Sequence, residues 1–572
     1  MRLAALAGVL LLAACAAPQG AQSAAPAVFE SPYGNYLAGQ FARGQGDIKT
    51  AAAFFARAAA QDPQSLFLAR NALAAQLMQG NFAAARPLAL RIHAKNPGQS
   101  LANLVLGVIA LKENRPQAAL TYLKAMQPVG LESLTVPMLM AWSEAGAGDT
   151  AAALTALQPL AGVPAFDPLR QFHAALIEDL AGNSAKADAD YRATIASGGE
   201  SAEVVAAYGN FLERHGRKDA ARALFKNFLA DQPQNPGIQA ALKMVNTPTT
   251  PKPLVGSASA GAAEALYGIA AITEADTGLG VGSVYLRMAI YLRPDFTFAH
   301  LLLADVYESA GDWRHAIEAY DGIPADSPYR WSADLRIAWG LDQLHETDRA
   351  VALLRKLVKA DRQRTEALST LGDILRGEDK FKQAVAAYSE AIARLKPETS
   401  NDWSLFYARG IAYEQSHDWP KAEADFLKAL RLNPNQPYVL NYLGYSWVVR
   451  GTNLEEAQRM IQRAVALAPD DGFIVDSLGW AYYHLHEYKR AVAELERAVA
   501  LSPEDPTIND HLGDAYWRAG RHEEARYQWQ RVLTLKPKPE DIPILKRKIA
   551  IGLGESAGLN LRHAARVVQA GS

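Results

Sequence analysis

The residues that could do chemistry in this chain are few, and their spacing argues against a catalytic or metal site. His484, His486 and Glu487 lie close together and carry groups that bind transition metals. Residues two apart on a helix face different directions, so the two imidazoles would not share one ion. The cluster also falls where a predicted helix ends, and we interpret it as a solvated surface. Asp470 and Asp471 follow a proline at a predicted helix start, where negative charge suits the helix dipole without any catalytic role.

Sequence motifs of the common enzyme classes are absent. The chain contains no His-Glu-x-x-His zinc signature, no Gly-x-x-x-x-Gly-Lys-Ser/Thr phosphate loop and no Gly-x-Ser-x-Gly nucleophile elbow. The glycine-rich stretch at 278–282 looks like a nucleotide loop, but it lies between two predicted helices with no strand before it. We therefore expect a protein that is not an enzyme and needs no cofactor or metal.

Composition and charge narrow the class of protein further. The 572 residues carry a formal net charge of −2, with 49% hydrophobic and 21% charged residues, which suits a folded chain. This near-neutral balance gives no support for nucleic-acid binding. A single cysteine excludes an intrachain disulfide and a cysteine-cluster metal site. Abundant Ala and Leu favour helices, so an all-β fold is not expected.

The first residues are typical of a secretory signal. Met1-Arg2 is followed by an almost wholly apolar run from Leu3 to Leu12 and then by small residues. The run is too short to span a bilayer, which takes about 20 helical residues. We expect residues 1–14 to be a signal peptide.

The only cysteine comes directly after this run. Ala13-Ala14-Cys15 resembles the bacterial lipobox, which implies lipidation of Cys15 and stable membrane anchoring by more than one acyl chain. Ala16 follows, and the lack of Asp there implies sorting to the inner leaflet of the outer membrane, facing the periplasm. Residues 15–29 are expected to form a flexible tether.

Most of the remaining chain is a repeat of 34 residues. Alanines mark the period, first in six copies and later at spacings of 34 to 38: Ala51, Ala85, Ala119, Ala153, Ala187, Ala221, Ala316, Ala350, Ala384, Ala422, Ala457, Ala491 and Ala525. A small residue usually stands twelve positions before the alanine, a large one four positions after it, and often a proline twelve positions after it. Gly513, Ala525, Trp529 and Pro537 show the full pattern.

This pattern resembles the tetratricopeptide repeat (TPR) family. The resemblance implies an all-α superhelical solenoid of about 14 helix-turn-helix repeats in two blocks, with small residues allowing close approach of paired helices. Six repeats are expected in 30–245 and eight in 261–537, followed by a capping helix and tail in 538–572. The helix, which carries Lys546, Arg547 and Lys548, is expected to cover the last repeat and to expose a charged face. Residues 246–260, rich in Pro, Thr and Ser, would be a linker, either a free hinge or an ordered loop packed on the solenoid.

The resemblance also implies a concave groove lined by the first helix of each repeat. Aromatic side chains beside Asp, Asn and Arg are good interface anchors, and the C-terminal block is richer in them. Several of these aromatic residues could instead pack between helices. The candidate partner-binding residues are Tyr407, Asn441, Tyr445, Phe473, Asp476, Trp480, Tyr483, Asp510, Asp514, Trp517 and Arg518.

A lipid-anchored periplasmic TPR solenoid resembles the NlpI-like and LbcA-like outer-membrane lipoproteins. That resemblance implies an adaptor that brings cell-wall hydrolases to a carboxyl-terminal processing protease, with both partners held close together. The alternative is an assembly factor for an outer-membrane secretion, pilus or polysaccharide-export complex. In both cases the partners are proteins and the membrane, through the lipid anchor.

Overall fold

The computed structural model describes residues 31–277 and 280–554, and within these ranges the chain is all-helical, with thirty α-helices and two short 3₁₀ helices. The expected signal peptide, Cys15, the tether and residues 555–572 of the tail lie outside the described residues. Among the helices described, none is both long and apolar enough to cross a membrane.

The chain forms two compact units, Met1–Asp334 and Leu335–Ser572. The described helices of the first unit are α1 (Pro32–Gly44), α2 (Ile48–Gln61), α3 (Leu66–Met78), α4 (Phe82–Lys95), α5 (Ser100–Lys112), α6 (Pro116–Lys124), α7 (Glu132–Gly146), α8 (Thr150–Ala156), η1 (Gln158–Leu160), α9 (Asp167–Leu180), α10 (Ser184–Ala196), α11 (Ala202–Arg214), α12 (Lys218–Asp231), α13 (Pro236–Met244), α14 (Ala258–Thr277), α15 (Val281–Leu292), α16 (Thr297–Ser309) and α17 (Trp313–Asp321).

The boundary between the units falls inside α18 (Arg330–Gln343). The second unit continues with α19 (Thr347–Ala360), α20 (Glu366–Gly377), α21 (Phe381–Arg394), η2 (Ser400–Asp402), α22 (Trp403–Gln415), α23 (Trp419–Leu432), α24 (Pro437–Arg450), α25 (Leu454–Leu467), α26 (Gly472–His484), α27 (Tyr488–Leu501), α28 (Pro506–Arg518), α29 (His522–Thr534) and α30 (Ile542–Ile551).

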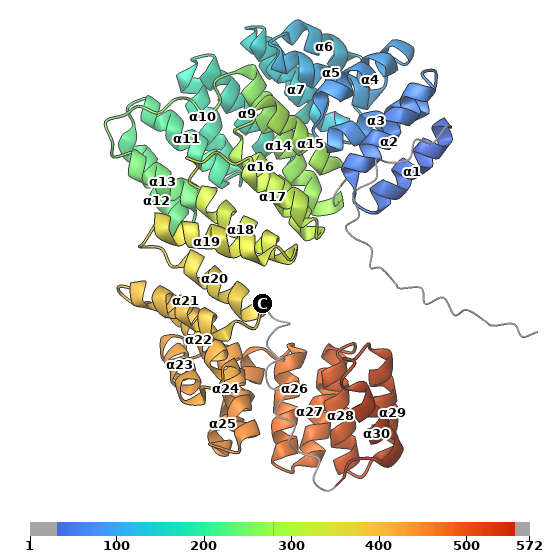
Figure 1. The fold of residues 1–572 in the computed structure, drawn as a ribbon. Coiled ribbons are helices and arrows are strands. Elements are labelled where there is room, and N and C mark those ends of the chain that lie inside the picture. Colours follow the sequence, from blue (N-terminus) through green and yellow to red (C-terminus); the bar gives the residue numbers. More distant parts are fainter. Residues whose placement is uncertain (1–30, 278–279, 555–572) are drawn as a thin grey trace, which may run out of the picture. The chain divides into compact units, whose positions relative to one another are not determined.

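Consecutive helices pack as antiparallel pairs along the chain (Figure 1). Six pairs run from α1–α2 to α11–α12, and eight run from α14–α15 to α28–α29, with α13 standing between the two series and α30 after the last. The expected solenoid of about 14 helix-turn-helix repeats in two blocks is therefore confirmed.

Several pairs are held by a close contact at a glycine of the first helix, which leaves a notch for a large side chain of the second helix. Gly410 in α22 lies against Phe426 in α23 so closely that a Cβ atom on it would come within 2.6 Å of the ring. Gly513 and Trp529 make the same contact at 2.4 Å. The large residue thus fills the notch of its own pair, which explains why it follows the small residue at a constant distance in sequence.

The predicted linker packs within the first unit. Asn210 Nδ2 donates a hydrogen bond to the Lys252 carbonyl at 2.8 Å, and Lys218 Nζ donates to the Thr247 carbonyl at 2.5 Å. Val255 is buried. Of the two alternatives for 246–260, the structure therefore has the packed loop, and the division into compact units comes later, at Asp334.

In the first unit, two later helices pack against the first helices of earlier repeats, on the face that would line the concave groove of a TPR solenoid. α14 packs on α5, α7 and α9, while α15 packs on α3 and α5, all first helices of their pairs (Figure 1). Small residues allow these helices to pack closely. A Cβ atom on Gly261 of α14, for example, would lie 2.2 Å from the Trp142 ring of α7. Tyr285 and Thr135 join their hydroxyls at 3.0 Å across the same interface.

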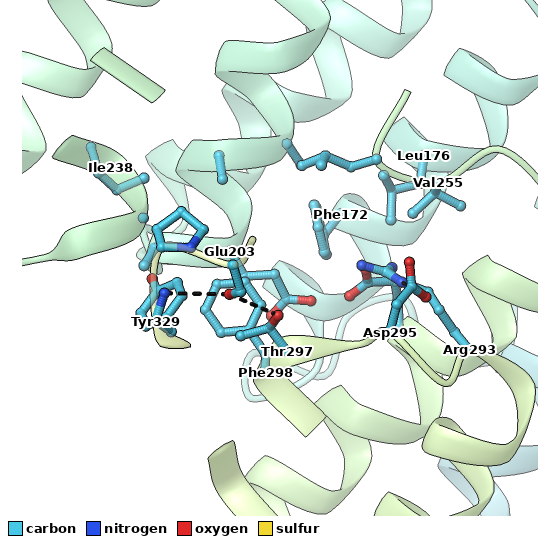
Figure 2. A pocket seen from close by; sticks show the side chains of 18 residues that line it. Phe172, Leu176, Glu203, Ile238, Val255, Arg293, Asp295, Thr297, Phe298 and Tyr329 are labelled. Atoms are coloured by element: carbon cyan, nitrogen blue, oxygen red, sulfur yellow. Dashed lines mark hydrogen bonds and ion pairs between the residues drawn. The ribbon is translucent and has the colours of Figure 1, made fainter. Parts of the chain in front are cut away.

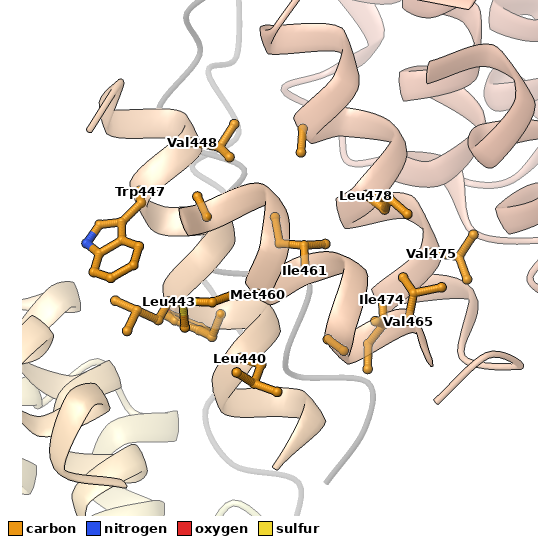
Figure 3. Packing of buried hydrophobic residues seen from close by; sticks show 14 of the residues in the cluster. Leu440, Leu443, Trp447, Val448, Met460, Ile461, Val465, Ile474, Val475 and Leu478 are labelled. Carbon is orange, nitrogen blue, oxygen red and sulfur yellow. The ribbon is translucent and has the colours of Figure 1, made fainter. Parts of the chain in front are cut away.

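The second unit has a continuous apolar core between its repeats. Leu443, Met460 and Ile461 pack between α24 and α25, and Val475 and Leu478 extend the same cluster from α26 (Figure 3). Burial of such side chains contributes roughly 1.5–3 kcal/mol each before the entropy cost of ordering the chain is counted. This core positions the first helices that carry the candidate site.

The glycine notch can be tested by a matched pair of substitutions in first helices of the second unit. Gly410→Ala should destabilise the unit by about 1–3 kcal/mol, because its Cβ overpacks against Phe426. Gly377→Ala should leave stability unchanged or raise it slightly, because the space beside Gly377 is open and alanine favours the helix. Urea unfolding followed by circular dichroism measures both, and equal midpoints would contradict the notch.

Candidate partner-binding site of the C-terminal unit

The residues predicted to bind a partner all lie on first helices of successive repeats in the second unit. They come from α22, α24, α26 and α28, and α26 packs on both α24 and α28. Side-chain contacts between α26 and α28 confirm that this row shares one face: Arg518 Nε lies 3.5 Å from Tyr483 Oη, and His511 contacts Asp476. The residues chosen from the sequence pattern therefore lie on neighbouring first helices, as predicted, and whether a partner binds there stays a prediction.

The side chains divide by exposure, however, in a way that the repeat pattern did not distinguish. Five are buried and contribute to packing: Asn441, Tyr445, Asp476, Tyr483 and Asp514. Six are half-buried: Tyr407, Phe473, Trp480, Asp510, Trp517 and Arg518. The expectation that several aromatic residues pack between helices thus applies to Tyr445 and Tyr483, which a partner would not reach directly.

A buried histidine organises the centre of the row. His511 Nδ1 lies 3.0 Å from both carboxylate oxygens of Asp476, and its ring stacks on Trp480 with centroids 3.8 Å apart. Burial alone would lower the pKa of His511, but the Asp476 carboxylate outweighs it and raises the pKa above its ordinary value. Trp480 also stacks on Tyr483 at 4.5 Å, so its orientation is held from two sides.

The two acidic candidates on α28 are occupied by the chain itself. Lys548 Nζ of α30 donates to Asp510 Oδ1 at 2.8 Å and lies 2.7 Å from Asp514 Oδ1. Trp529 Nε1 donates to the same Asp514 oxygen at 3.0 Å. Burial raises the pKa of Asp514 to about 6, and the neighbouring Asp510 adds to this while Lys548 opposes it. These carboxylates therefore dock α30 and do not face a free groove.

The charged face expected on the capping helix does not include Lys548. Lys546 and Arg547 are exposed as expected, but the Lys548 side chain is only 13% exposed because it turns toward the repeat. Lys548 follows the buried Leu545 by three residues, and residues three apart share a helix face. The same spacing could have identified it in the sequence.

The segment after α30 covers the other two candidates on α28. Arg518 Nη2 donates to the Gly554 carbonyl at 2.9 Å. Gly552 lies against the ring of Trp517, and a Cβ atom there would come within 1.8 Å of it. Trp517 and Arg518 are thus partly covered within the unit.

Two candidates have polar atoms that are buried without a hydrogen-bond partner among the described residues, Tyr407 Oη and Asn441 Oδ1. Tyr407 packs edge to face against Tyr442 with centroids 5.9 Å apart, and burial raises its pKa. Phe473 and Trp480, both on α26 and half-buried, lie between this region and the part of α28 that Lys548 holds. Together with Tyr407 and Trp517 they are the half-buried aromatic residues of the candidate site.

Only part of the histidine cluster is solvated, which corrects its interpretation as a surface: His486 is exposed, but His484 is half-buried. His486 lies in the left-handed region with φ of 61°, and its Nδ1 pairs with Tyr488 Oη at 2.7 Å. His484 packs against Trp480, and burial lowers its pKa to about 4. No group of three His, Cys, Asp or Glu side chains in the described residues has a geometry that could hold a metal ion.

Comparison with known proteins assigns the fold family. Models of the tetratricopeptide repeat match residues 74–128, 174–236, 403–436 and 477–541, and a tetratricopeptide repeat-like domain matches 296–405. Together they cover more than half of the chain. The chain belongs to the tetratricopeptide repeat family. Members of this family are scaffolds for protein–protein interaction.

Individual relatives share only part of their length with this TPR chain. It is 29% identical over 189 residues to the TPR repeat-containing protein PA4667 of Pseudomonas aeruginosa, a match that covers 32% of this chain and 31% of that protein. It is 31% identical over 193 residues to human tetratricopeptide repeat protein 13, covering 33% of this chain and 22% of that protein. The chain therefore spans less than a third of either relative.

Solved TPR structures resemble the chain at low identity. Yeast Tom70 is 12% identical, with 91% of this chain and 94% of Tom70 covered and a TM-score of 0.30. A tetratricopeptide repeat protein from Parabacteroides merdae is 17% identical, with 44% of this chain and 97% of that protein covered and a TM-score of 0.36.

The docking of α30 can be tested with two lysines of the same helix. Lys548→Met should lower the hydrogen-exchange protection of the α30 amides by about tenfold or more, because it leaves two largely buried carboxylates without their cation. Lys546→Met is the control, since Lys546 is exposed and should leave protection unchanged. Hydrogen–deuterium exchange with mass spectrometry measures both, and equal protection in the two variants would refute a docking role for Lys548.

Proposed function

We propose that this TPR chain is a lipid-anchored, periplasm-facing adaptor that brings cell-wall hydrolase substrates to a carboxyl-terminal processing protease. Its membership of a family of protein-binding scaffolds supports the part of the proposal that concerns protein partners. The lipobox-like Ala13-Ala14-Cys15 and the Ala16 that follows it support anchoring in the outer membrane. The chain would act by proximity, which raises the effective concentration of substrate at the protease, and needs no catalytic group of its own.

The observation that carries the proposal is the division into two compact units with different TPR faces. The first unit covers much of its own inner face with α14 and α15. The second unit leaves Phe473 and Trp480 partly accessible on α26. Two compact units with different surfaces would allow one protein to hold two different partners.

Affinity capture distinguishes this role from the alternative. The full-length chain, purified in mild detergent, is used to capture partners from a detergent-solubilised bacterial envelope, and these are identified by mass spectrometry. We expect a carboxyl-terminal processing protease together with cell-wall hydrolases. Recovery of secretin, pilus or polysaccharide-export subunits without a protease would reject the adaptor and favour the assembly factor.

The α26 aromatic residues provide a sharper test of the site. Phe473→Ala and Trp480→Ala should each weaken binding of the captured partner by about 2 kcal/mol, or roughly 30-fold, as expected for aromatic anchors at an interface. Tyr527→Ala is the matched control, because Tyr527 is 70% exposed but lies on a second helix, α29. Calorimetry with the purified partner measures the three affinities, after circular dichroism has shown unchanged folding. Full binding by both α26 variants would place the site elsewhere.

A further inference from the structure

Two buried carboxyl groups of the first unit are paired with each other. A cavity of about 210 Å³ lies where α9, α11 and α13 meet α14 (Figure 2), and both Glu203 and Glu264 line it. Arg293 Nη1 donates to Glu264 Oε1 at 2.5 Å, and the two carboxyl side chains are hydrogen-bonded to each other. Burial and the Glu264 carboxylate raise the pKa of Glu203 well above its ordinary value, so Glu203 is the protonated partner. Apolar surface that lacks a partner among the described residues is found instead on α1.

An exposed apolar stripe runs along α1. Tyr33, Leu37 and Phe41, here called the terminal stripe, follow one another at intervals of four residues and therefore share one face of the helix. Their exposed fractions are 66%, 65% and 72%. Large apolar side chains on protein surfaces are normally scattered singly, so a row of three marks a candidate interaction surface.

The terminal stripe is exposed because α1 belongs to the first repeat. α1 packs mainly on α2, and no described helix precedes it (Figure 1). Two periods of 34 residues later, the positions of Leu37 and Phe41 are taken by Val105 and Ile109 of α5, which are buried. The same face is thus closed inside the array and open at its N-terminal end, where a solenoid normally needs a polar cap.

The covalent chain keeps this face close to the expected lipid anchor. Ser31 follows Cys15 by sixteen residues, and even a fully extended chain of that length spans at most roughly 55 Å. α1 is the first described helix after Cys15. An acylated Cys15 would therefore hold α1 within this distance of the bilayer, and this step rests on the lipid anchor of the proposed function.

The chemistry and the size of the terminal stripe fit a phospholipid surface. Tyr, Phe and Leu are typical of segments that lie in the bilayer interface. α1 contains no Asp or Glu, and the exposed Arg43 in its last turn can pair with lipid phosphates. A stable protein–protein interface takes about 20–30 residues a side, so three side chains would hold a second copy of the chain only weakly.

We propose that α1 docks on the phospholipid bilayer through Tyr33, Leu37 and Phe41, so that the bilayer takes the place of a capping repeat. The acyl chains on Cys15 supply the attachment, and the terminal stripe determines which end of the first unit faces the membrane. Because the anchor makes this contact intramolecular, a small apolar surface is sufficient for it.

A fluorescent label on the terminal stripe tests this contact in the full-length chain. Lipidation blocks the only native thiol, that of Cys15, so the new thiol of a Leu37→Cys variant can be labelled alone with nitrobenzoxadiazole. The labelled chain is reconstituted in vesicles of phosphatidylethanolamine and phosphatidylglycerol, with or without spin-labelled phospholipid. We expect the emission to shift to the blue and the spin-labelled lipid to quench it about twofold or more, as for a side chain within the interface. A Tyr527→Cys variant labelled in the same way is the control, because Tyr527 is 70% exposed on α29, and it should show neither effect.

A second substitution in the Leu37→Cys chain tests whether the stripe itself holds the helix on the bilayer. Tyr33→Asp should lower the docked fraction about tenfold, because a carboxylate replaces a ring at the bilayer. Tyr527→Asp is the matched control, since Tyr527 is as exposed as Tyr33, and it should leave the quenching unchanged. Circular dichroism checks that both variants fold, and equal quenching in the two would contradict the proposal.

The outcomes distinguish failure of this inference from failure of the proposed function. Two labels on each Leu37→Cys chain, detected by intact mass, would show that Cys15 is free, which rejects the lipid anchor and the inference with it. A single label whose emission does not shift would overturn the docking of α1 and leave the anchor standing. A shifted label that spin-labelled lipid does not quench would also overturn it, because a second copy of the chain or residues 16–30 would then cover the terminal stripe.

Discussion

Most helix pairs of this chain depend on one close contact, between a small residue in the first helix and a large side chain sixteen positions later in the second. Gly410 with Phe426 and Gly513 with Trp529 show it most clearly. The glycine lets the ring approach the backbone of the first helix, and the ring excludes water from the pair. Because the same contact recurs with the period of the sequence, each unit is a stack of similar layers, each packed on its neighbours.

Stacked layers leave the faces of their first helices open. This chain covers much of that face in the first unit, and the last repeat in the second, with its own helices. In the first unit α14 and α15 pack on α3, α5, α7 and α9, with Gly261 against Trp142. In the second unit α30 is held on α28 through Lys548, Asp510 and Asp514. The two contacts differ in chemistry, since one uses close apolar packing and the other a buried ion cluster. The surfaces left for partners are correspondingly smaller than a bare solenoid would offer.

Polar groups inside these layers are arranged in small clusters that link neighbouring repeats. Asp476 of α26 and His511 of α28 form one such cluster, with Trp480 stacked on the imidazole. Glu264 and Arg293 form another in the first unit. Buried charges of this kind contribute little net stability when paired, but they are costly when separated, so they favour one relative position of the helices that carry them.

The sequence by itself determined the helix pairs, their number and the family, because the repeat pattern records contacts that are local in the chain. It also placed the candidate residues on the first helices of successive repeats, from α22 to α28. Only the tertiary structure decided which of those residues are accessible. Asn441, Tyr445, Asp476, Tyr483 and Asp514 are buried because neighbouring repeats and α30 close over them. The return of α14 onto the first repeats, and the cavity beside it, likewise come from contacts between residues more than a hundred positions apart, as with Thr135 and Tyr285, which no local period encodes.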